Sequence, residues 1–523
     1  MQTTFVSSRT PSSLLSQVIT VVVALGLLWL SFAIYSSGQA VWAALVLGLG
    51  ALSLYVYSSA KTLAWRYLFP GVMAMLVFVA FPLVYTIQIG FTNYSATNLL
   101  GQNRARAYLL DQADVNESKA FAFSVYADGT TVRLVLTPQG EGMPSGPSAR
   151  YISPPLSLEG KPLSGPVSMQ PLASGIVPGQ IYTLRQTIAH RSTLMALRLK
   201  LPDQSELDYA GLHEFAVFEP LWQSQADGAL KRLADGVVYH PNRDTGFFED
   251  VQGGRLQPGF KVGVGLANYA RLFGDADMRG PFVSIFVWTV VFAGLTVVFS
   301  TAIGMTLAVL LNWEALKYRT LYRTLLFLPY AVPGFISILV FKGLFNQNFG
   351  EINAILNAIF GVKPAWFADP TLAKAMILIV NTWLGYPYIM VLCTGLIKSI
   401  PSDLYEASAI AGAKPLTNFF RITAPLIVKP LTPLLISAFA FNFNNFVLIS
   451  LLTDGRPDYL NTKLPAGTTD ILVSYTYRIA FTDAGANFGL AAAISTVIFL
   501  LIAVLSMVNL KLSQPKDERK GGH

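Results

Sequence analysis

The most prominent pattern in the sequence is a series of long apolar runs with few charged residues. Eight runs are long enough to cross the hydrocarbon core of a bilayer, which takes about 20 residues in helical conformation. They lie at about residues 14–36, 40–59, 68–92, 281–311, 324–345, 371–397, 426–452 and 486–510. The first run is too long for the apolar region of a cleavable signal peptide, so we expect it to remain a membrane span.

One long segment, residues 94–279, interrupts the series with a different composition. Residues 121–126 and 131–136 are rich in aromatic and β-branched side chains, and Asp128-Gly129 between them predicts a hairpin turn. Further expectations are loops over 138–180, a strand over 193–201, and a strand or short helix over 209–218. The segment is long enough to bury its own core, so we expect a mostly β domain inserted between the third and fourth spans.

The composition supports a membrane protein and indicates its orientation. Of 523 residues, 53% are hydrophobic and 13% charged, which is too apolar for an ordinary soluble protein. The insert holds 18 acidic and 17 basic residues, so the excess of positive charge lies in the membrane part. This excess reflects the orientation of the chain in the membrane and does not indicate a nucleic-acid-binding surface. Lys and Arg in short loops mark the cytoplasmic side. They gather in alternate connections: Arg9; Lys61 and Arg66; Lys317, Arg319 and Arg323; Lys398, Lys414, Arg421 and Lys429; and Lys511, Lys516, Arg519 and Lys520. Both termini are therefore expected in the cytoplasm and the insert outside.

Several kinds of chemistry have no support in the sequence. No acidic, basic or histidine residue lies in the middle of a span, which argues against a proton pump, a cation channel and a charged substrate. The single cysteine, Cys393, can form neither an internal disulfide nor a cysteine cluster for zinc. A phosphate-binding loop, a nucleophile elbow and an HExxH motif are all missing from the sequence. The sequence therefore gives no support for an enzyme, and if the chain is part of a pump, its energy must come from another chain.

Neutral amides and aromatic residues occur inside two spans. Helical spacing gathers Asn381, Leu384, Gly385 and Tyr388 on one face of the sixth span, and Ala438, Phe441, Asn442 and Asn445 on one face of the seventh. Amides in a membrane need hydrogen-bonding partners. One possibility is hydrogen bonding between helices. The other is a sugar, whose C–H face stacks on rings and whose hydroxyls pair with groups that both donate and accept.

The segment Tyr405–Pro425 lies between the sixth and seventh spans. A carboxylate on a short Ala/Ser run, then Gly412, then Pro425 predict a helix, a glycine break and a second short helix. The segment resembles the EAA loop of ABC-importer permeases, and the matching positions are Glu406, Ala407, Ser408, Gly412, Ile422 and Pro425. Ser408 departs from the usual second alanine.

The resemblance extends beyond this loop. The stretches NTWLGYPY, DLYEASAIAGA, AFNFNNFVLIS, YTYRIAF and NFGLAAAIST look like the MalF-type permease subunits of maltose/maltodextrin ABC importers. The fold implied is an α-helical polytopic membrane protein of the type I ABC importer permease class, with about eight transmembrane helices and a mostly β extracytoplasmic domain between helices three and four. The domains expected are helices 1–3 over 1–93, the insert over 94–279, the permease core over 280–512 with the EAA loop at 400–425, and a cytoplasmic tail over 513–523.

The resemblance also implies a function and partners. The chain would be the transmembrane permease subunit of an ATP-driven maltose/maltodextrin importer in the bacterial inner membrane. It would pair with a second, MalG-like permease subunit, two copies of a MalK-like ATPase, a periplasmic maltose-binding protein and membrane lipid, with no nucleic acid. No cofactor is expected in this chain, because ATP and Mg²⁺ would be bound by the ATPase.

Residue roles follow from the same resemblance. Tyr388 and Phe441 would stack on glucosyl rings. The hydroxyls would bond to Asn381, Asn442, Asn445 and the backbone at Leu384 and Gly385. Glu406, Ala407, Ser408 and Gly412 would couple to the ATPase. The family has a serine where this chain has Ala438, with Ser437 beside it. The 453–485 loop, including Thr468, Tyr475 and Tyr477, is expected near the binding protein or the sugar.

Two other classes of function are compatible with a membrane protein of this composition. A passive or ion-coupled sugar carrier would need no ATPase, but the EAA-like loop and the lack of ionisable groups in the spans argue against it. A membrane-anchored receptor or enzyme would use the insert as its active part, but the sequence offers no catalytic constellation there.

Overall fold

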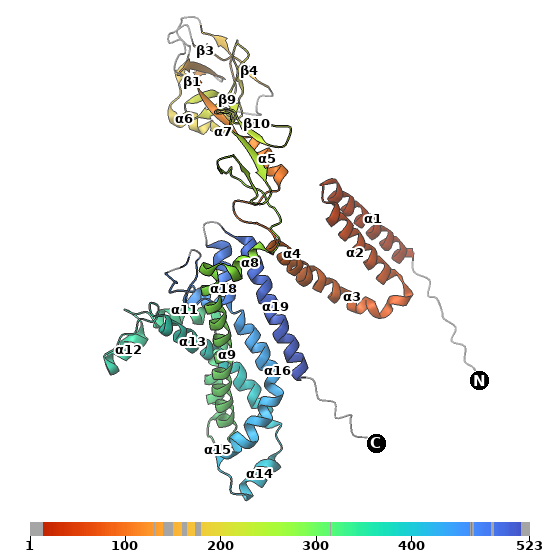
Figure 1. Ribbon diagram of the computed structural model, residues 1–523, viewed down its shortest axis with the longest axis vertical. Coiled ribbons are helices and arrows are strands. Elements are labelled where there is room, and N and C mark those ends of the chain that lie inside the picture. Colours follow the sequence, from red (N-terminus) through yellow and green to blue (C-terminus); the bar gives the residue numbers. More distant parts are fainter. Residues whose placement is uncertain are drawn as a thin grey trace, which may run out of the picture. The chain divides into compact units, whose positions relative to one another are not determined.

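The computed structural model describes residues 14–129, 131–139, 150–158, 165–172, 179–313, 315–460, 462, 465–482 and 486–513 (Figure 1). Arg9 and the predicted tail from residue 514 onward lie outside this described part. The chain divides into two compact units, Met1–Ile89 and Gly90–His523.

The first unit contains the first three predicted spans. Its elements are α1 (Leu14–Ser36), α2 (Ala40–Ser58), the 3₁₀-helix η1 (Ala60–Thr62), α3 (Leu63–Met75), the π-helix η2 (Leu76–Ala80) and most of α4 (Phe81–Gly90). The turn between α1 and α2 uses Gly38 in the left-handed region, at φ 81°. Gly50 lets the two helices approach closely, because a Cβ there would lie 2.9 Å from Leu27 Cδ1. The segment from α3 to α4 has the length and hydropathy of one continuous span.

The second unit contains the remaining helices. They are α8 (Ala267–Gly274), α9 (Ala276–Asn312), α10 (Arg319–Ala331), α11 (Gly334–Leu344), α12 (Glu351–Phe360), α13 (Pro370–Lys398), α14 (Ser402–Ile410), α15 (Pro415–Asn418), the π-helix η4 (Phe419–Thr423), α16 (Ala424–Phe443), α17 (Phe446–Leu452), α18 (Leu472–Phe481) and α19 (Phe488–Ser513). The two longest, α9 and α13, pack against each other along their length. A Cβ on Gly304 of α9 would lie 2.9 Å from the Met390 backbone nitrogen, so this contact requires a glycine.

The predicted series of spans is confirmed, with two changes in shape. Seven helices in the described residues are long and apolar enough to cross a membrane, and α10 with α11 makes an eighth if the pair counts as one span. This pair is bent by 91° at Val332–Pro333, since a residue before proline favours extended backbone and Pro333 cannot donate an N–H. The predicted span 426–452 also breaks, because α16 ends at Phe443 and α17 begins at Phe446.

The insert is mostly β, as predicted. One sheet contains β1 (Ala113–Asp128), β2 (Thr131–Pro138), β3 (Tyr151–Ile152), β4 (Val167–Ser168), β5 (Gln170–Pro171), β6 (Gln180–Ile181), β7 (Leu199–Lys200), β8 (Glu206–Gly211) and β9 (Glu214–Pro220). A second sheet contains β10 (Trp222–Ser224), β11 (Leu230–Arg232), β12 (Val238–Asn242) and β13 (Phe247–Glu249). Three short helices accompany them: α5 (Gln102–Leu110), α6 (Leu184–Ala189) and α7 (Arg191–Met195).

The predicted hairpin and one predicted strand have different outcomes. The hairpin is confirmed, since Asp128 pairs with Thr131 and Gly129 adopts φ 67° in the turn. The strand expected over 193–201 is wrong for most of its length, because α7 occupies its beginning and β7 is only two residues long. Leu194 and Leu197 are both buried, and their spacing of three suits a helical turn better than the alternation of a strand.

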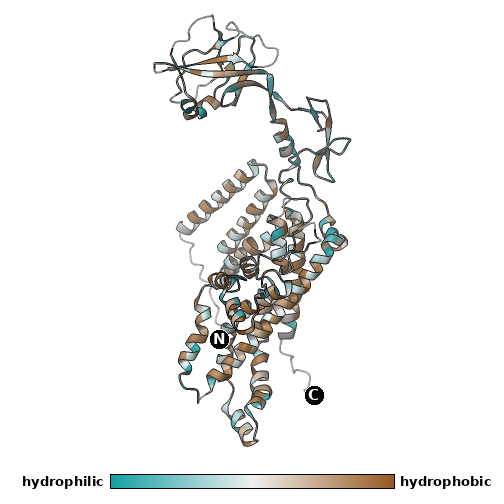
Figure 2. Ribbon diagram, turned by 90° about the vertical axis from the view of Figure 1, so that its left-hand side faces the viewer, coloured by the Kyte–Doolittle hydropathy of each residue, from teal (hydrophilic) through white to brown (hydrophobic). Residues whose placement is uncertain are grey.

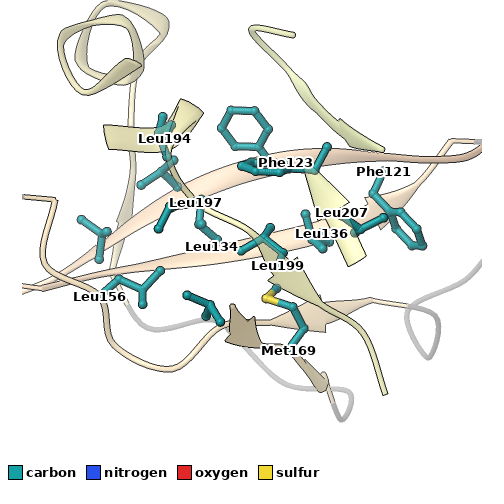
Figure 3. Packing of buried hydrophobic residues seen from close by; sticks show 14 of the residues in the cluster. Phe121, Phe123, Leu134, Leu136, Leu156, Met169, Leu194, Leu197, Leu199 and Leu207 are labelled. Carbon is teal, nitrogen blue, oxygen red and sulfur yellow. The ribbon is translucent and has the colours of Figure 1, made fainter. Parts of the chain in front are cut away.

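The insert has a hydrophobic core of its own. Side chains of β1, β2, α7 and β7 meet in it; Figure 3 labels Phe121, Phe123, Leu134, Leu136, Leu194 and Leu199 among them. The segment 209–218, predicted as a strand or short helix, forms parts of β8 and β9, and Phe215 is fully buried in this core. In contrast, the long helices of the membrane part consist mainly of hydrophobic residues (Figure 2).

Candidate functional site

A cavity lined by both polar and apolar residues lies in the second unit and has a volume of about 840 Å³. Its walls come from α9, the α10–α11 break, α13, α16 and the beginning of α17. All seven residues expected to contact sugar line it: Asn381, Leu384, Gly385, Tyr388, Phe441, Asn442 and Asn445. Residues predicted on two separate spans therefore line the same cavity.

The three asparagines form a hydrogen-bonded group between the helices. Asn381 Nδ2 donates to Asn442 Oδ1 at 2.7 Å and to Thr296 Oγ1 of α9 at 3.1 Å. Asn445 Nδ2 donates to Asn381 Oδ1 at 3.3 Å. Asn381 and Asn442 are buried. In this conformation the amides therefore bond to one another. A ligand that bonded to them would have to replace some of these hydrogen bonds.

The break between α16 and α17 gives Asn445 its position. Its side-chain oxygen accepts a hydrogen bond from the Leu448 backbone N–H at 3.4 Å and caps α17. The prediction of one continuous helical face from Ala438 to Asn445 is therefore wrong in detail. Consecutive asparagines favour caps and turns over helix interiors, and this preference is a signal for the break.

The two predicted stacking residues keep much of their surface free. Phe441 is 71% exposed and Tyr388 is 43% exposed, although both line the cavity. Ser437, beside Ala438, donates its hydroxyl to the Pro433 carbonyl at 2.9 Å. The Ser437 hydroxyl is thus already bonded within α16.

A further polar wall of the cavity was not predicted from the sequence. Ser300 and Thr301 of α9 line the cavity, as do the residues from Pro329 to Gly334 at the α10–α11 break. A signal for the first pair exists in the recurrence of Thr296, Ser300 and Gly304 at four-residue spacing, which places small and hydroxyl side chains on one helix face.

The predicted elbow between the sixth and seventh spans has the expected shape. Helix α14 ends near Gly412, which adopts φ 72°, and the short helices α15 and η4 follow. The Ser408 hydroxyl donates to the Asn418 side-chain oxygen across the elbow. Glu406 and Ala407 are exposed, and so are four large apolar side chains of this region: Leu404, Ile410, Leu416 and Phe420.

The 453–485 region differs from the expected loop. It contains α18, and Tyr475 is fully buried, so the expectation that Tyr475 contacts a sugar or another protein is wrong. Tyr477 is 47% exposed, and the Thr468 hydroxyl donates to the Pro457 carbonyl at 3.0 Å. This region also contains an ion cluster that was not predicted from the sequence, in which Arg478 bonds to Asp470 at 2.9 Å and to Asp458 at 2.7 Å.

Comparisons with known proteins place these features in a family. Residues 100–265 match the model of the "Maltose transport system permease protein MalF P2 domain". Residues 300–516 match the "Binding-protein-dependent transport system inner membrane component". The chain is also similar to a solved bacterial alginate ABC transporter in complex with an alginate-bound periplasmic protein, with a TM-score of 0.41 and 23% identity over 50% of this chain and 85% of that chain.

Curated relatives extend the likeness over nearly the whole chain. The Klebsiella aerogenes maltose/maltodextrin transport system permease protein MalF is 50% identical over 493 residues, covering 92% of this chain and 93% of that protein. The protein of the same name from Escherichia coli strain K12 is 48% identical over 502 residues, covering 94% of this chain and 95% of that protein. With apolar spans, a β-rich insert and identity at this level, the chain belongs to the MalF family of inner-membrane transport permeases.

Proposed function

We propose that the chain forms the translocation path and a sugar site of an ATP-driven maltose/maltodextrin importer. The observation that carries this proposal is the meeting of all seven expected sugar residues on one cavity. The MalF relatives are named for maltose and maltodextrin transport, which supplies the substrate class.

The chemistry of the cavity fits a neutral oligosaccharide. Its described lining contains no acidic, basic or histidine side chain, so nothing there attracts or repels a charged ligand strongly. The exposed faces of Tyr388 and Phe441 suit stacking on the C–H faces of glucosyl rings. The asparagine amides can exchange their mutual hydrogen bonds for sugar hydroxyls, because an amide both donates and accepts.

In this proposal the elbow couples the sugar site to an ATPase. The exposed apolar side chains on α14, α15 and η4 offer a docking face, with Glu406 beside them. Helix α16 begins at the elbow and carries Phe441 and Asn442 near its other end. A pull on the elbow is therefore transmitted along one helix to the cavity wall. ATP and Mg²⁺ belong to the separate ATPase, and this chain holds no cofactor.

The proposal includes the remaining partners and the orientation. The chain pairs with a second permease subunit and two ATPase copies, and its insert, residues 94–279, meets a periplasmic binding protein. Residues 280–512 form the permease core, and both termini are cytoplasmic. Lys and Arg in the alternate short loops support this orientation.

Vesicle uptake tests the function. Maltose uptake is measured in vesicles that contain this chain, the second permease subunit and the ATPase, with binding protein on the outside. We expect accumulation that needs both ATP and the ATPase, and none in vesicles without this chain. Equal maltose entry without ATP or without the ATPase would contradict the proposal and indicate a passive carrier.

A further inference from the structure

Two hydroxyls on α9 line the cavity without a hydrogen-bond partner in the described part of the chain. Ser300 is 5% exposed, and its Oγ is buried and unbonded. The Oγ1 of Thr301, the next residue, is likewise buried and unbonded. Both residues belong to the lining of the 840 Å³ cavity.

In the described helices Ser31 and Thr382 also have a buried hydroxyl without a partner, whereas several other hydroxyl residues bond to their own helix. Thr289, Thr394 and Thr496 each donate to the carbonyl four residues earlier, at 2.7–2.8 Å. Such back-bonding is the ordinary way for Ser and Thr to satisfy their hydroxyls inside a helix. A buried polar atom without a partner is costly, so a pair of them beside a cavity points to a ligand that completes their bonding.

The position of Ser300 connects it to the predicted sugar contacts. A Cβ on Gly385 of α13 would lie 2.8 Å from Ser300 Oγ, so this hydroxyl faces the backbone of a predicted sugar-contacting residue. One turn earlier on α9, Thr296 accepts from Asn381. The same face of α9 thus carries one hydroxyl that bonds to the amide group, at Thr296, and one hydroxyl without a partner, at Ser300.

The α10–α11 break adds backbone groups to the same wall. Helix α11 is 11 residues long and begins after Pro333, which offers no side-chain cap. The first N–H groups of a helix have no acceptor within the helix. Pro333 and Gly334 both line the cavity. The Ile336 and Ser337 N–H groups bond to the Pro333 carbonyl, which leaves the N–H groups of Gly334 and Phe335. Hydroxyls on α9 and these N–H groups therefore add hydrogen-bonding groups from elements other than α13 and α16, which carry Asn381 and Asn442.

We propose that Ser300, with Thr301 beside it, is a specificity-determining contact for a neutral glucosyl unit. Its hydroxyl bonds sugar hydroxyls that the α13 and α16 amides do not reach. The inference rests on the proposed function and adds a second hydrogen-bonding wall to the same site.

The competing explanation is that Ser300 is only a small residue that lets α9 and α13 pack closely. Ser300→Ala separates the two, because alanine keeps the small size and removes only the hydroxyl. If the hydroxyl serves the sugar, the sugar-free variant melts at the same or a higher temperature, since an unsatisfied polar atom is gone. Its affinity for maltose falls at the same time.

The test is maltose binding to the purified complex of this chain with its permease and ATPase partners, without binding protein, so that only the membrane site is measured. We expect about fivefold weaker binding for Ser300→Ala, a change of the size that one hydrogen bond provides, and a smaller loss for Thr301→Ala. The control is Ser53→Ala in α2, whose hydroxyl already donates to the Leu49 carbonyl at 2.8 Å. It should bind like the wild type.

The outcomes separate the inference from the proposed function. Wild-type binding with an unchanged Ser300→Ala affinity would overturn the role of Ser300 and leave the sugar site standing. Weaker binding together with a lower melting temperature of the sugar-free variant would also overturn it, because that result indicates a packing role. Absence of maltose binding by the wild type would contradict the membrane sugar site itself.

Discussion

Replacing Arg478 by methionine is expected to destabilise the helical core, because it leaves a buried carboxylate without its cationic partner. Asp470 is fully buried and bonds to Arg478 Nη1 at 2.9 Å. The same carboxylate accepts from the Gly467 N–H at 2.7 Å and from the Ser474 hydroxyl at 2.8 Å. Methionine keeps the apolar stem of the arginine and removes its charge and its hydrogen bonds.

The size of the effect follows from the burial of Asp470. Removing one member of a buried ion pair costs about 3–5 kcal/mol. Burial raises the pKa of Asp470 to about 6, while Arg478 and the hydrogen bonds from Ser474 and Gly467 oppose that rise. Without Arg478 the pKa rises further above its value in the unfolded chain, so the ionised carboxylate weakens the folded state most at high pH. The deficit of the variant should therefore shrink as the pH falls from 8 to 5.

The assay is thermal or denaturant unfolding of the purified complex at several pH values. A matched variant, Asp458→Asn, should cost less than about 1 kcal/mol, because Asp458 is half-exposed and its ion pair with Arg478 is largely solvated on that side. The double variant Arg478→Met/Asp470→Leu should regain much of the loss, since apolar residues can replace a buried pair. An Arg478→Met protein as stable as the wild type, or a double variant as unstable as the single one, would show that Arg478 does not stabilise the fold by pairing with the buried Asp470 carboxylate.

Three further predictions concern the elbow and the cavity. Gly412→Ala should lower the stability of the folded protein by about 1 kcal/mol, and Gly412→Asn should lower it by less. Gly412 has φ 72° and a Cβ there meets no neighbouring atom, so the loss comes from backbone strain alone. Equal melting curves for both variants and the wild type would contradict this prediction. Glu406→Lys should lower maltose uptake by about tenfold or more while ATP hydrolysis continues, because it reverses the charge on the proposed ATPase-facing surface, and normal uptake would remove the coupling role. Phe441→Ala should lower maltose uptake by about tenfold. The melting temperature should not change, since the ring is 71% exposed, and ATP hydrolysis should still be stimulated by the binding protein. An unchanged uptake rate would mean that the ring does not contact sugar.

The spans, and the grouping of residues that line the cavity on one helix face, could be predicted from the sequence because both depend on local periodicity. Apolar length defines a span, and the 3.6-residue repeat places Asn381 and Tyr388 on one face whatever the helix packs against. The same reasoning failed at Asn445, where a helix break and a cap replaced a continuous helix. There the intrinsic preference of asparagine for helix ends was the stronger signal.

Features that depend on contacts between distant segments could not be predicted in this way. Arg478 lies in an apolar helix too short for a span. Its role as an ion-pair partner is visible only in the folded structure, where Asp470 lies against it. Ser300 resembles any small residue in a long helix until packing leaves its hydroxyl without a partner beside a cavity. The mutual bonding of the three asparagines likewise requires α13 and α16 to be placed together.

ATP-dependent maltose uptake by the complete complex, with and without Asn442→Ala, tests directly whether the sugar site lies in this cavity. Asn442 is buried on the cavity and bonded to Asn381, whereas the nearby Asn444 is exposed and outside the cavity lining, so Asn444→Ala is the matched control. We expect uptake that requires ATP, falls strongly in Asn442→Ala and is preserved in Asn444→Ala. ATP-dependent uptake that is equal in the wild type and both variants would contradict the placement of the sugar site in this cavity.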